Sequence, residues 1–401
     1  MSETLVINGG SPYKTKPFPQ WPISGERELE LITEVVKSGN WWRMTGTMVD
    51  EFEEKFAKMH DTEYCLAVTN GTHAIELSLS VLDIGRGDEV IVPALTFIST
   101  GSAVIYCNAT PVLVDVDPET FCMSPEAFEK AITPRTKAVI PVHMAGHACD
   151  MDRICEIARK HNIKVIEDAA HGHGGEWKNK RIGSMGDIAI FSFQNGKLMT
   201  CGEGGCIVTN SKEFYDTAYL MHGVGRPKND RTYQHLVMGS NYRMSEFHAA
   251  ILLAQLERIE HLNEVREKHA LFLDNLLEDV EGITPQGRKE GSTLNPHYMY
   301  MFYYDSLYFN GMSRQQFVDA LIAEGIPSFI SFPVLSDTKF FKEQKFGRRI
   351  EGYDYSQEAD LSNARKIASD VIWLPHYTLE GDTEDLKDIA GAINKIKNAG
   401  R

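Results

Sequence analysis

The chain has 401 residues, 42% of them hydrophobic and 24% charged, which is typical of a soluble globular protein with two domains and excludes a disordered or fibrous one. Its 41 Lys and Arg residues against 56 Asp and Glu residues give a formal net charge of -15, which repels a phosphate backbone, so we expect no nucleic-acid partner. No apolar run approaches the roughly 20 residues that cross a bilayer, and "MSETLVINGG" lacks the features of a signal peptide, so we expect no membrane partner.

Between residues 64 and 210, short apolar runs alternate with amphipathic or small-residue stretches. After the first run come Ala74, Leu77 and Val81, which recur at helical spacing. Strands that alternate with helices in this way indicate a mostly parallel sheet between helices. Ligands bind beyond the carboxyl ends of the strands of such sheets. The runs are "YCLAVTN", "EVIVPALTF", "KAVIPVH", "KVIED", "IAIFSF" and "GGCIVTN".

A helical pattern without Gly or Pro extends from Ser245 to Val280, and it predicts one long helix or two helices nearly in line. Such an element can join a large domain to a smaller one. The stretches "HYMYMFYYD", "SRQQFVDALIAEG" and "DTEDLKDIAGAINKIK" that follow suggest a small α+β domain. We therefore expect an N-terminal arm and a large domain in residues 1–260, and a small C-terminal domain in residues 261–401.

Two of the predicted strands end at residues that suit a ligand. Gly71 and Thr72 open a helix, where free backbone N–H groups and the helix dipole can bind an anion. The alternative is that Asn70 or Thr72 only caps this helix. Phe97 follows the second strand, where its ring can face a ligand or pack in the core, as most phenylalanines do.

Three further places carry polar candidates. Asp168 directly follows a buried strand and needs a partner, which is either a structural donor or a protonated ring nitrogen. Lys197 stands between an apolar strand that contains Ser192 and the glycines of "GEGG", although a lysine by itself is usually solvated. Asn241 and Arg243 lie in "GSNYRMSEF", just before the long helical stretch.

Together these residues match the needs of pyridoxal 5'-phosphate. Its phosphate can bind at the helix N-terminus, and its ring can stack on Phe97. Its pyridine nitrogen can pair with Asp168, which makes the ring an electron sink, and the amine of Lys197 can form a Schiff base with its aldehyde. No other common cofactor uses all four features, so we predict this cofactor.

The spacing of "VTNGTHA", "VPALTF", "VIEDAAH", "FSFQNGKLMTCGEGG" and "GSNYRMSEF" resembles that of the sugar and aminocyclitol aminotransferases of the DegT/StrS family. The resemblance covers nearly the whole chain, and its Lys-to-"GEGG" segment is highly specific. It implies an α/β fold of the fold-type I pyridoxal-phosphate transferases, with a large domain built on a mostly parallel sheet and a smaller C-terminal α+β domain. It also implies a homodimer with shared active sites.

The resemblance implies a role for each matching residue. Lys197 would hold the cofactor covalently, Asp168 would pair with its pyridine nitrogen, and His171 would lie near its phenolic oxygen, where many members carry glutamine. Ser192 would contact the phosphate beside Gly71 and Thr72. Asn241 would contact the phosphate of the other subunit.

The implied activity is a ping-pong transamination in which Lys197 acts as the general base. The resemblance implies glutamine or glutamate as the amino donor and a cyclic keto compound as the acceptor, in aminosugar, aminocyclitol or antibiotic biosynthesis. The likeness of stretches such as "NWWRMTG" and "GRPKNDRTYQH" to members of this family implies a six-membered carbocyclic ketone rather than a nucleotide-linked 4-keto or 3-keto sugar. A pyridoxal-phosphate-binding regulator without catalysis is the alternative of another class, and the presence of both Lys197 and Asp168 argues against it.

Other conspicuous residues have weaker functional readings. Arg43 and Arg243 are candidates for substrate contact. A basic block is formed by Arg226, Lys228 and Arg231, and it either binds an anionic group of the substrate or belongs to a solvated loop. The pairs His171 with His173 and His143 with His147 lack a third ligand at a convincing spacing, so we predict no metal.

The seven cysteines are scattered along the chain without a repeated spacing. An odd number without a pattern does not describe a disulfide framework. We therefore expect reduced thiols and a cytoplasmic protein.

Overall fold

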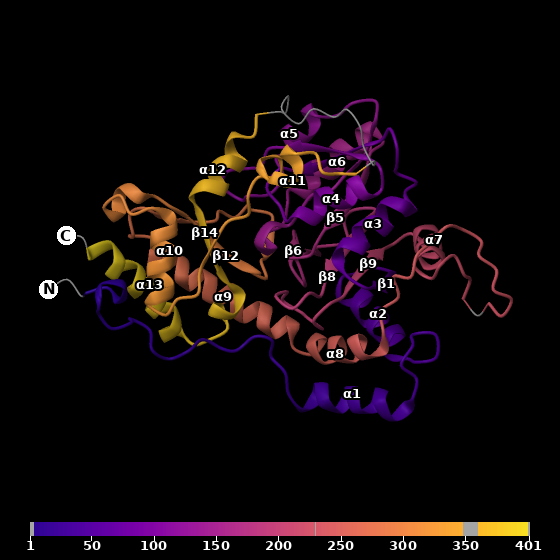
Figure 1. The fold of residues 1–401 in the computed structure, drawn as a ribbon, viewed down its shortest axis with the longest axis horizontal. Helices are drawn as coiled ribbons and strands as arrows, with labels where there is room; N and C mark the ends of the chain where they lie inside the picture. Colours follow the sequence, from indigo (N-terminus) through magenta and orange to yellow (C-terminus); the bar gives the residue numbers. More distant parts are fainter. Residues whose placement is uncertain (1–3, 229, 348–359, 400–401) are drawn as a thin grey trace.

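The computed structural model describes residues 4–228, 230–347 and 360–399 (Figure 1). Its main sheet has the strand order β1-β9-β8-β5-β4-β2-β3. β9 runs antiparallel to both β1 and β8, and the other neighbours are parallel, so the predicted α/β fold with a mostly parallel sheet is confirmed. The strands are β1 (Tyr64–Val68), β2 (Glu89–Pro93), β3 (Thr110–Val114), β4 (Thr136–Val139), β5 (Lys164–Asp168), β8 (Ile188–Ser192) and β9 (Gly205–Thr209).

Helices cover this sheet, whose strands are mostly apolar. Every residue of β2, β8 and β9 is buried, as expected for strands that are enclosed on both faces. The surrounding helices are α2 (Met48–Met59), α3 (Gly71–Val81), α4 (Ile98–Tyr106), α5 (Pro125–Lys130), α6 (Met151–His161), α7 (Lys212–His222) and α8 (Glu246–Leu256).

One strand of the main sheet is absent from our sequence prediction. β3 pairs with β2 at the edge of the sheet, in parallel register from Thr110 to Val114. Its sequence, "TPVLV", follows the small-residue stretch of α4 and contains a proline. Proline is tolerated at a sheet edge, where fewer backbone donors are needed, but it weakens the strand pattern in a sequence.

The long helical stretch forms two helices that run end to end, α8 and α9 (Ile259–Leu277) (Figure 1). Between them Arg258 reaches back to the N-terminal arm, donating to the carbonyl of Ile23 at 2.9 Å and pairing with Glu28 of α1 (Glu26–Ser38). The second of the two predicted alternatives is therefore the observed one.

The C-terminal part is built on a second sheet, in the order β10-β12-β14-β13, with antiparallel neighbours throughout. Its strands are β10 (Ile283–Pro285), β12 (Met299–Tyr304), β13 (Phe329–Ile330) and β14 (Val371–Pro375), and its helices are α10 (Arg314–Ala323), α11 (Lys339–Lys342), α12 (Ser362–Asp370) and α13 (Thr383–Asn398). A small third sheet joins β6 (Glu176–Trp177) and β7 (Lys180–Arg181) to β11 (Ser292–Leu294). Short 3-10 helices are η1 (Val6–Asn8), η2 (Met144–Gly146), η3 (Ser306–Phe309), η4 (Leu335–Asp337) and η6 (His376–Leu379).

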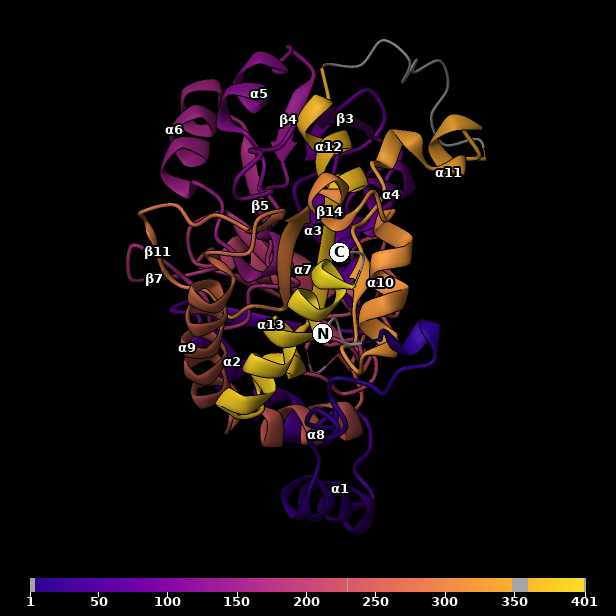
Figure 2. The ribbon, with the colours of Figure 1, turned by 90° about the vertical axis from the view of Figure 1, so that its left-hand side faces the viewer.

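The hydrophobic side chains form two cores, and their membership does not follow chain order. Leu5 of the N-terminal arm belongs to the C-terminal core, and Lys14 of the arm pairs with Asp385 at the start of α13. Figure 2 shows the N-terminal end of the described chain near α10 and α13. Conversely, Phe341 and Ile367 pack in the core of the main sheet. The arm therefore packs with the C-terminal unit, and the division at residues 260 and 261 stays a prediction.

Candidate active site

A cavity of about 630 Å³ lies at the carboxyl ends of the strands of the main sheet. This volume is typical of a small-molecule site. Asn70 follows β1, Thr96 follows β2, and the cavity also reaches the last residues of β5 and β8. The cavity brings together these sequence-predicted residues: Gly71, Thr72, Phe97, Asp168, His171, Ser192 and Lys197.

Lys197 lies in the loop between β8 and β9, which the backbone holds tightly. The N–H of Phe193 donates to the carbonyl of Gly204 at 2.8 Å, and the N–H of Lys197 donates to the carbonyl of Gln194 at 2.8 Å. A Cβ atom on Gly205 would lie 2.4 Å from the carbonyl carbon of Asn70. The glycine after the lysine loop therefore lets β9 approach the start of α3, so that both ends of the loop are fixed.

The amine of Lys197 is poorly hydrated and faces an acid. Burial lowers the pKa of Lys197 to about 8, and the charge of Asp168 partly opposes this shift. The amine also lies 4.4 Å from the centre of the Tyr298 ring. A lysine whose pKa is lowered by burial is a better nucleophile and base near neutral pH than a solvated one.

The N-terminus of α3 opens onto the same cavity. Asn70 caps the helix by accepting the N–H of His73 at 2.8 Å, so the capping alternative is correct for this residue. Gly71 is needed for a different reason, because a Cβ there would lie 2.9 Å from Cβ of Ser192. The hydroxyl of Thr72 donates to the hydroxyl of Ser99 at 2.8 Å, beside the free N–H groups of the first turn. Backbone N–H groups and hydroxyls at a helix N-terminus suit a phosphate.

Asp168 ends β5 with its carboxylate inside the cavity. One oxygen accepts the hydroxyl of Thr100 at 2.9 Å, and the other accepts the N–H of Ala170 at 3.2 Å. Burial raises the pKa of Asp168, while these hydrogen bonds and the charge of Lys197 oppose the rise. A carboxylate held in this way at a cavity wall suits a cationic ring N–H.

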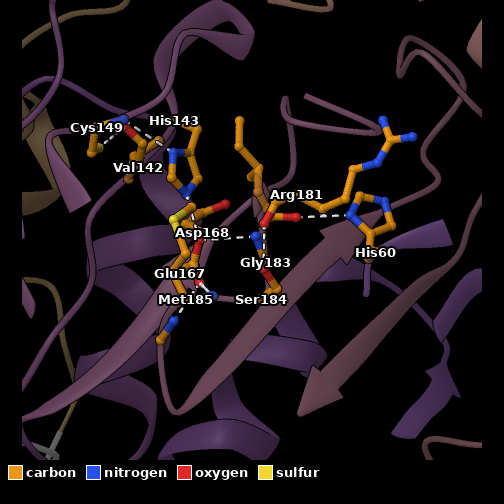
Figure 3. Close-up of polar contacts among 12 residues, drawn as sticks. His60, Val142, His143, Cys149, Glu167, Asp168, Arg181, Gly183, Ser184 and Met185 are labelled. Atoms are coloured by element: carbon orange, nitrogen blue, oxygen red, sulfur yellow. Dashed lines mark hydrogen bonds and ion pairs between the residues drawn. The ribbon is translucent and has the colours of Figure 1, made fainter. Parts of the chain in front are cut away.

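Glu167, the preceding residue, points to the other side of β5 and holds the neighbouring loops (Figure 3). It accepts the ring N–H of His143 at 3.1 Å and the backbone N–H groups of Gly183 and Met185 at 2.9 and 2.8 Å. The N–H of Gly186 is a fourth donor, at 2.5 Å. Burial tends to raise the pKa of Glu167, but His143 and these N–H donors outweigh burial and lower it. This ionised group supports the strand that carries Asp168.

His171 has a buried ring nitrogen that is free to bond a ligand. Its Nδ1 has no hydrogen-bond partner among the described residues, and its ring stacks on Tyr298 with centroids 4.3 Å apart. Burial, followed by the charge of Lys197, lowers the pKa of His171 well below its ordinary value, so the ring is neutral. A neutral imidazole beside the lysine can donate to or accept from a ligand oxygen.

These residues fit pyridoxal phosphate on structural grounds. The cavity offers an N-terminus for the phosphate, Asp168 for a protonated ring nitrogen, the unpaired Nδ1 of His171 for an oxygen substituent, and Lys197 for the aldehyde. Phe97 is 54% exposed in the described chain and so keeps a ring face free for stacking rather than packing in the core.

The opposite wall of the cavity is aromatic and comes from the C-terminal sheet. Tyr298 precedes β12, Phe332 follows β13, and Trp373 lies in β14. Sequence reasoning missed all three, although "HYMYMFYYD" is an aromatic cluster that could have drawn attention to Tyr298. Glu203, Gln194 and His73 are further lining residues that it missed.

Three predicted residues lie outside the cavity of their own chain. Asn241 is exposed, and Arg243 is half-buried near Trp42, 5.7 Å from its ring centre. Arg43 is buried, and its guanidinium pairs with Glu53 of α2 at 2.8 Å. Glu53 in turn accepts the N–H of Ala67 in β1 at 2.7 Å, so Arg43 helps to fasten α2 to the sheet. In its own chain Arg43 pairs with carboxylates and does not line the cavity, so its contact with substrate stays a prediction.

Two further histidines of the pairs considered as metal ligands, His143 and His173, bond other protein groups. His143 pairs with Glu167, and His173 bonds the carbonyl of Ser192 at 3.0 Å. Within residues 4–228, 230–347 and 360–399, no group of three His, Cys, Asp or Glu side chains is placed to hold a metal ion. In the same ranges, no helix combines the length and the apolar character that a membrane span requires.

Comparison with known proteins gives a family for this site. The chain is 43% identical over 382 residues to 3-amino-5-hydroxybenzoate synthase of Amycolatopsis mediterranei, covering 95% of this chain and 97% of that enzyme. It is 34% identical over 412 residues to L-glutamine:2-deoxy-scyllo-inosose aminotransferase of Streptoalloteichus tenebrarius, covering 98% and 97%. The crystal structure of a 3-amino-5-hydroxybenzoic acid synthase superposes with a TM-score of 0.88 at 41% identity, covering 96% of this chain and 99% of that one.

The family profile gives the same result as these relatives. It matches residues 22–394, which include every residue of the cavity. The predicted aminotransferase activity and the predicted cofactor are confirmed at the level of the family. The chain belongs to the DegT/DnrJ/EryC1/StrS aminotransferase family, whose cofactor is pyridoxal phosphate.

Proposed function

We propose that this protein transfers an amino group from glutamine or glutamate to a cyclic keto compound. The observation that carries the proposal is that the amine of Lys197 and the carboxylate of Asp168 face one cavity, into which the N-terminus of α3 also opens. The two relatives named above support the choice of substrates, since one aminates a scyllo-inosose with glutamine and the other makes an aminohydroxybenzoate.

Each polar residue of the cavity has a distinct task in this proposal. Lys197 removes and returns the protons at the reacting carbon, which its lowered pKa favours. Asp168 holds the ring nitrogen in its protonated state, and Ser192 and Thr72 assist the helix N-terminus in holding the phosphate. When bound, the cofactor supplies an electron sink for the reaction. His171 orients an oxygen substituent through its free Nδ1.

We favour a six-membered carbocyclic ketone as the acceptor over a nucleotide-linked sugar. Tyr298, Phe332 and Trp373 offer flat apolar surfaces to the faces of a ring. Among the described residues that line the cavity, Lys197 is the only lysine or arginine, and Asp168 and Glu203 are acids. Within a single chain, the pyrophosphate of a nucleotide sugar therefore meets no cation that is not already engaged in the chemistry.

The donor half of the reaction provides the first test. The purified holoenzyme is mixed with glutamine or glutamate alone, and the visible absorbance band of the cofactor is followed. We expect the band to be lost with a donor and restored by a cyclic ketone. A panel of carbocyclic ketones and nucleotide-linked 4-keto sugars, with products identified by mass spectrometry, then tests the acceptor. Preference for the nucleotide-linked sugars would reverse the ranking.

The same measurement separates an enzyme from a cofactor-binding regulator. A regulator would hold the cofactor and keep its absorbance band unchanged after addition of any amino donor. Lys197 and Asp168 together support the enzyme, because a regulator needs the lysine for binding but has no need of an acid that maintains an electron sink.

The active unit in this proposal is a cytoplasmic homodimer with shared sites. Asn241 lies outside the cavity of its own chain and is exposed, as a residue that serves a partner's site must be. Tyr233, Leu236 and Met238 nearby are also exposed, and Met238 is 95% exposed. Apolar side chains gathered in this way favour an interface. All seven cysteines are free thiols, which agrees with a reducing compartment.

A further inference from the structure

The N-terminal arm reaches the loop that carries Lys197 and bonds its backbone. The indole N–H of Trp21 donates to the carbonyl of Asn195 at 2.8 Å, two residues before Lys197. The indole also meets the ring of His376 edge to face, with ring centres 4.4 Å apart. One side chain of the arm is thus in contact with both the lysine loop and the C-terminal unit.

A buried ion pair of the C-terminal unit holds His376 in place. The Nδ1 atom of His376 bonds a carboxylate oxygen of Glu380 at 2.9 Å, and the guanidinium of Arg266 pairs with the same oxygen at 2.6 Å. All three side chains are buried. Burial lowers the pKa of His376, while Glu380 partly opposes this shift, so the ring is neutral. The direction of the imidazole is therefore set by groups that cannot easily move.

Arg266 also holds the segment that covers the amine of Lys197. Its Nε–H donates to the carbonyl of Pro296 at 2.8 Å, two residues before Tyr298. The ring of Tyr298 lies 4.4 Å from the amine of Lys197 and stacks on His376 with ring centres 6.2 Å apart. The ring that covers the amine and the indole that bonds the loop therefore both contact His376.

The arm itself is anchored on the C-terminal unit. Lys14 pairs with Asp385 of α13, and Glu324 at the end of α10 accepts the backbone N–H of Tyr13 at 2.9 Å. These anchors lie only a few residues before Trp21 along the chain. The hydrogen bond of Trp21 therefore ties the lysine loop to the C-terminal unit.

We propose that Trp21 and His376 form a clamp that positions the loop of Lys197 for proton transfer. This inference rests on the role of Lys197 in the proposed function. The strands β8 and β9 fix the two ends of the loop, but Asn195 near its tip is exposed, and the clamp holds it from outside. Neither Trp21 nor His376 lines the active-site cavity, so both act through the loop. Precise placement matters, because a shift of about 1 Å at a reacting group can lower a rate about 100-fold.

Hydrogen–deuterium exchange of the holoenzyme tests the clamp without turnover. Trp21→Phe keeps a ring against His376 and removes the N–H that bonds Asn195. Peptides of residues 193–201 should exchange about 5-fold faster in this variant, as expected for the loss of one hydrogen bond. Peptides of the C-terminal sheet should exchange as before. Trp21→Ala should give a larger effect, since it also removes the ring contact.

Tyr13→Phe is the matched control for Trp21→Phe. Tyr13 lies in the same arm, and this variant likewise keeps a ring and loses one polar hydrogen. A Cβ atom on Gly391 of α13 would lie 2.2 Å from the Tyr13 ring, so this ring lies against α13. We expect its loop to exchange as in the wild type, and urea unfolding checks that the variants keep their overall stability.

The donor half-reaction tests whether the clamp aligns the amine. With saturating glutamine, Trp21→Phe should lower the rate constant for loss of the cofactor band about 10-fold. The Kd for glutamine should stay the same, because the clamp does not line the cavity. The pH at which the rate constant is half-maximal should rise, since a looser loop admits water to an amine whose pKa is about 8 and moves this pKa towards the ordinary 10.5.

Equal exchange of the loop in the Trp21→Phe and Tyr13→Phe variants overturns the proposal. Faster exchange with an unchanged rate constant and pH profile also overturns it, because Trp21 would then stabilise the loop without aligning the amine. If no donor changes the cofactor band of the wild type, the proposed transamination is refuted, and the catalytic part of this inference falls with it. The exchange measurement needs no donor, so it distinguishes that failure from the absence of a clamp.

Discussion

The amine of Lys197 lies 4.4 Å from the centre of the Tyr298 ring, so a lysine from the main sheet rests on an aromatic face from the C-terminal unit. The same ring stacks on His171 at 4.3 Å. Tyr298 thus fixes two groups of the active site from a segment about 100 positions further along the chain. Burial is the main cause of the lowered pKa of Lys197, and the ring of Tyr298 is one of the groups that bury its amine.

Lys197→Ala should abolish the visible absorbance band of the cofactor and all turnover. Lys197 is the only lysine among the described residues of the cavity, so no second amine can bond the cofactor aldehyde. The control is Lys212→Ala, because Lys212 is exposed on α7 and pairs with Asp216. Absorbance and product formation are measured on both. Turnover by Lys197→Ala at the control's rate would refute the assignment.

Asp168→Asn should lower the rate of transamination by about 100-fold or more while the fold is kept. The single carbonyl oxygen of asparagine can still accept the N–H of Ala170, and its amide group can donate to the hydroxyl of Thr100, but asparagine has no charge with which to hold a proton on the ring nitrogen. Circular dichroism and unfolding by urea check the fold, and single-turnover kinetics give the rate. A near-normal rate in a folded variant would mean that Asp168 is not the partner of the ring nitrogen.

The stability of the cofactor-free protein should depend on pH through Lys197. Its pKa is about 8 when folded, against 10.5 as the ordinary value, so the unfolded chain binds more protons between these limits. Stability therefore rises with pH through this window, because the penalty of the buried charge disappears. Lys197→Met should exceed the wild type in its free energy of unfolding at pH 7, and the difference should shrink towards pH 10. A difference that does not change with pH would contradict the lowered pKa.

Glu167→Gln should reduce the free energy of unfolding by about 3 kcal/mol, because the amide places donors against backbone N–H donors in a buried site. Glu54→Gln is the matched control on an exposed residue. Since the pKa of Glu167 is lowered below its ordinary 4.5, its contribution is present above that pH and is lost as the pH falls through the lower folded value. Urea unfolding at pH 7 measures the loss, and equal losses in the two variants would show that the loops do not depend on Glu167.

A mixture of Asn241→Asp and Lys197→Ala chains should recover activity if the sites are shared. The aspartate repels the phosphate in the partner's site, whereas the alanine disables the site of its own chain. In a mixed dimer one site then carries both defects and the other carries neither. Random exchange makes half of the dimers mixed, so about one quarter of wild-type activity should return. No recovery, with mixing confirmed by native mass spectrometry, would mean that Asn241 serves its own chain.

The charged residues of the cavity, Asp168 and Lys197, were predictable from the sequence. Asp168 and Lys197 follow apolar strands, and a parallel sheet brings the ends of such strands to one edge. The resemblance of the motif spacing to the DegT/StrS family then implied the roles of these two residues. Phe97 was ambiguous, since only its 54% exposure shows that it faces the cavity rather than the core.

The rest depended on packing that no local pattern records. Tyr298, Phe332 and Trp373 come from the second sheet and reach the cavity only because the two cores meet there. Arg43 is a substrate candidate because of the motif around it, and a sequence does not show that its guanidinium pairs with Glu53 of α2. The break near Arg258 is marked by no proline or glycine, and it lies where the side chain of Arg258 bonds the N-terminal arm.

The aromatic wall has a consequence for how this enzyme can change. Trp373 lies in β14 and Phe332 follows β13, and in the described residues neither of these strands pairs with β5 or β8, which carry Asp168 and Ser192. Replacing Phe332 or Trp373 by a larger or smaller side chain changes the shape of the space for the acceptor. The positions of the residues that transfer the amine, Asp168 and Lys197, stay the same. New acceptors are therefore reached through substitutions in β13, β14 and the residues after them, and those substitutions leave the main sheet unaltered.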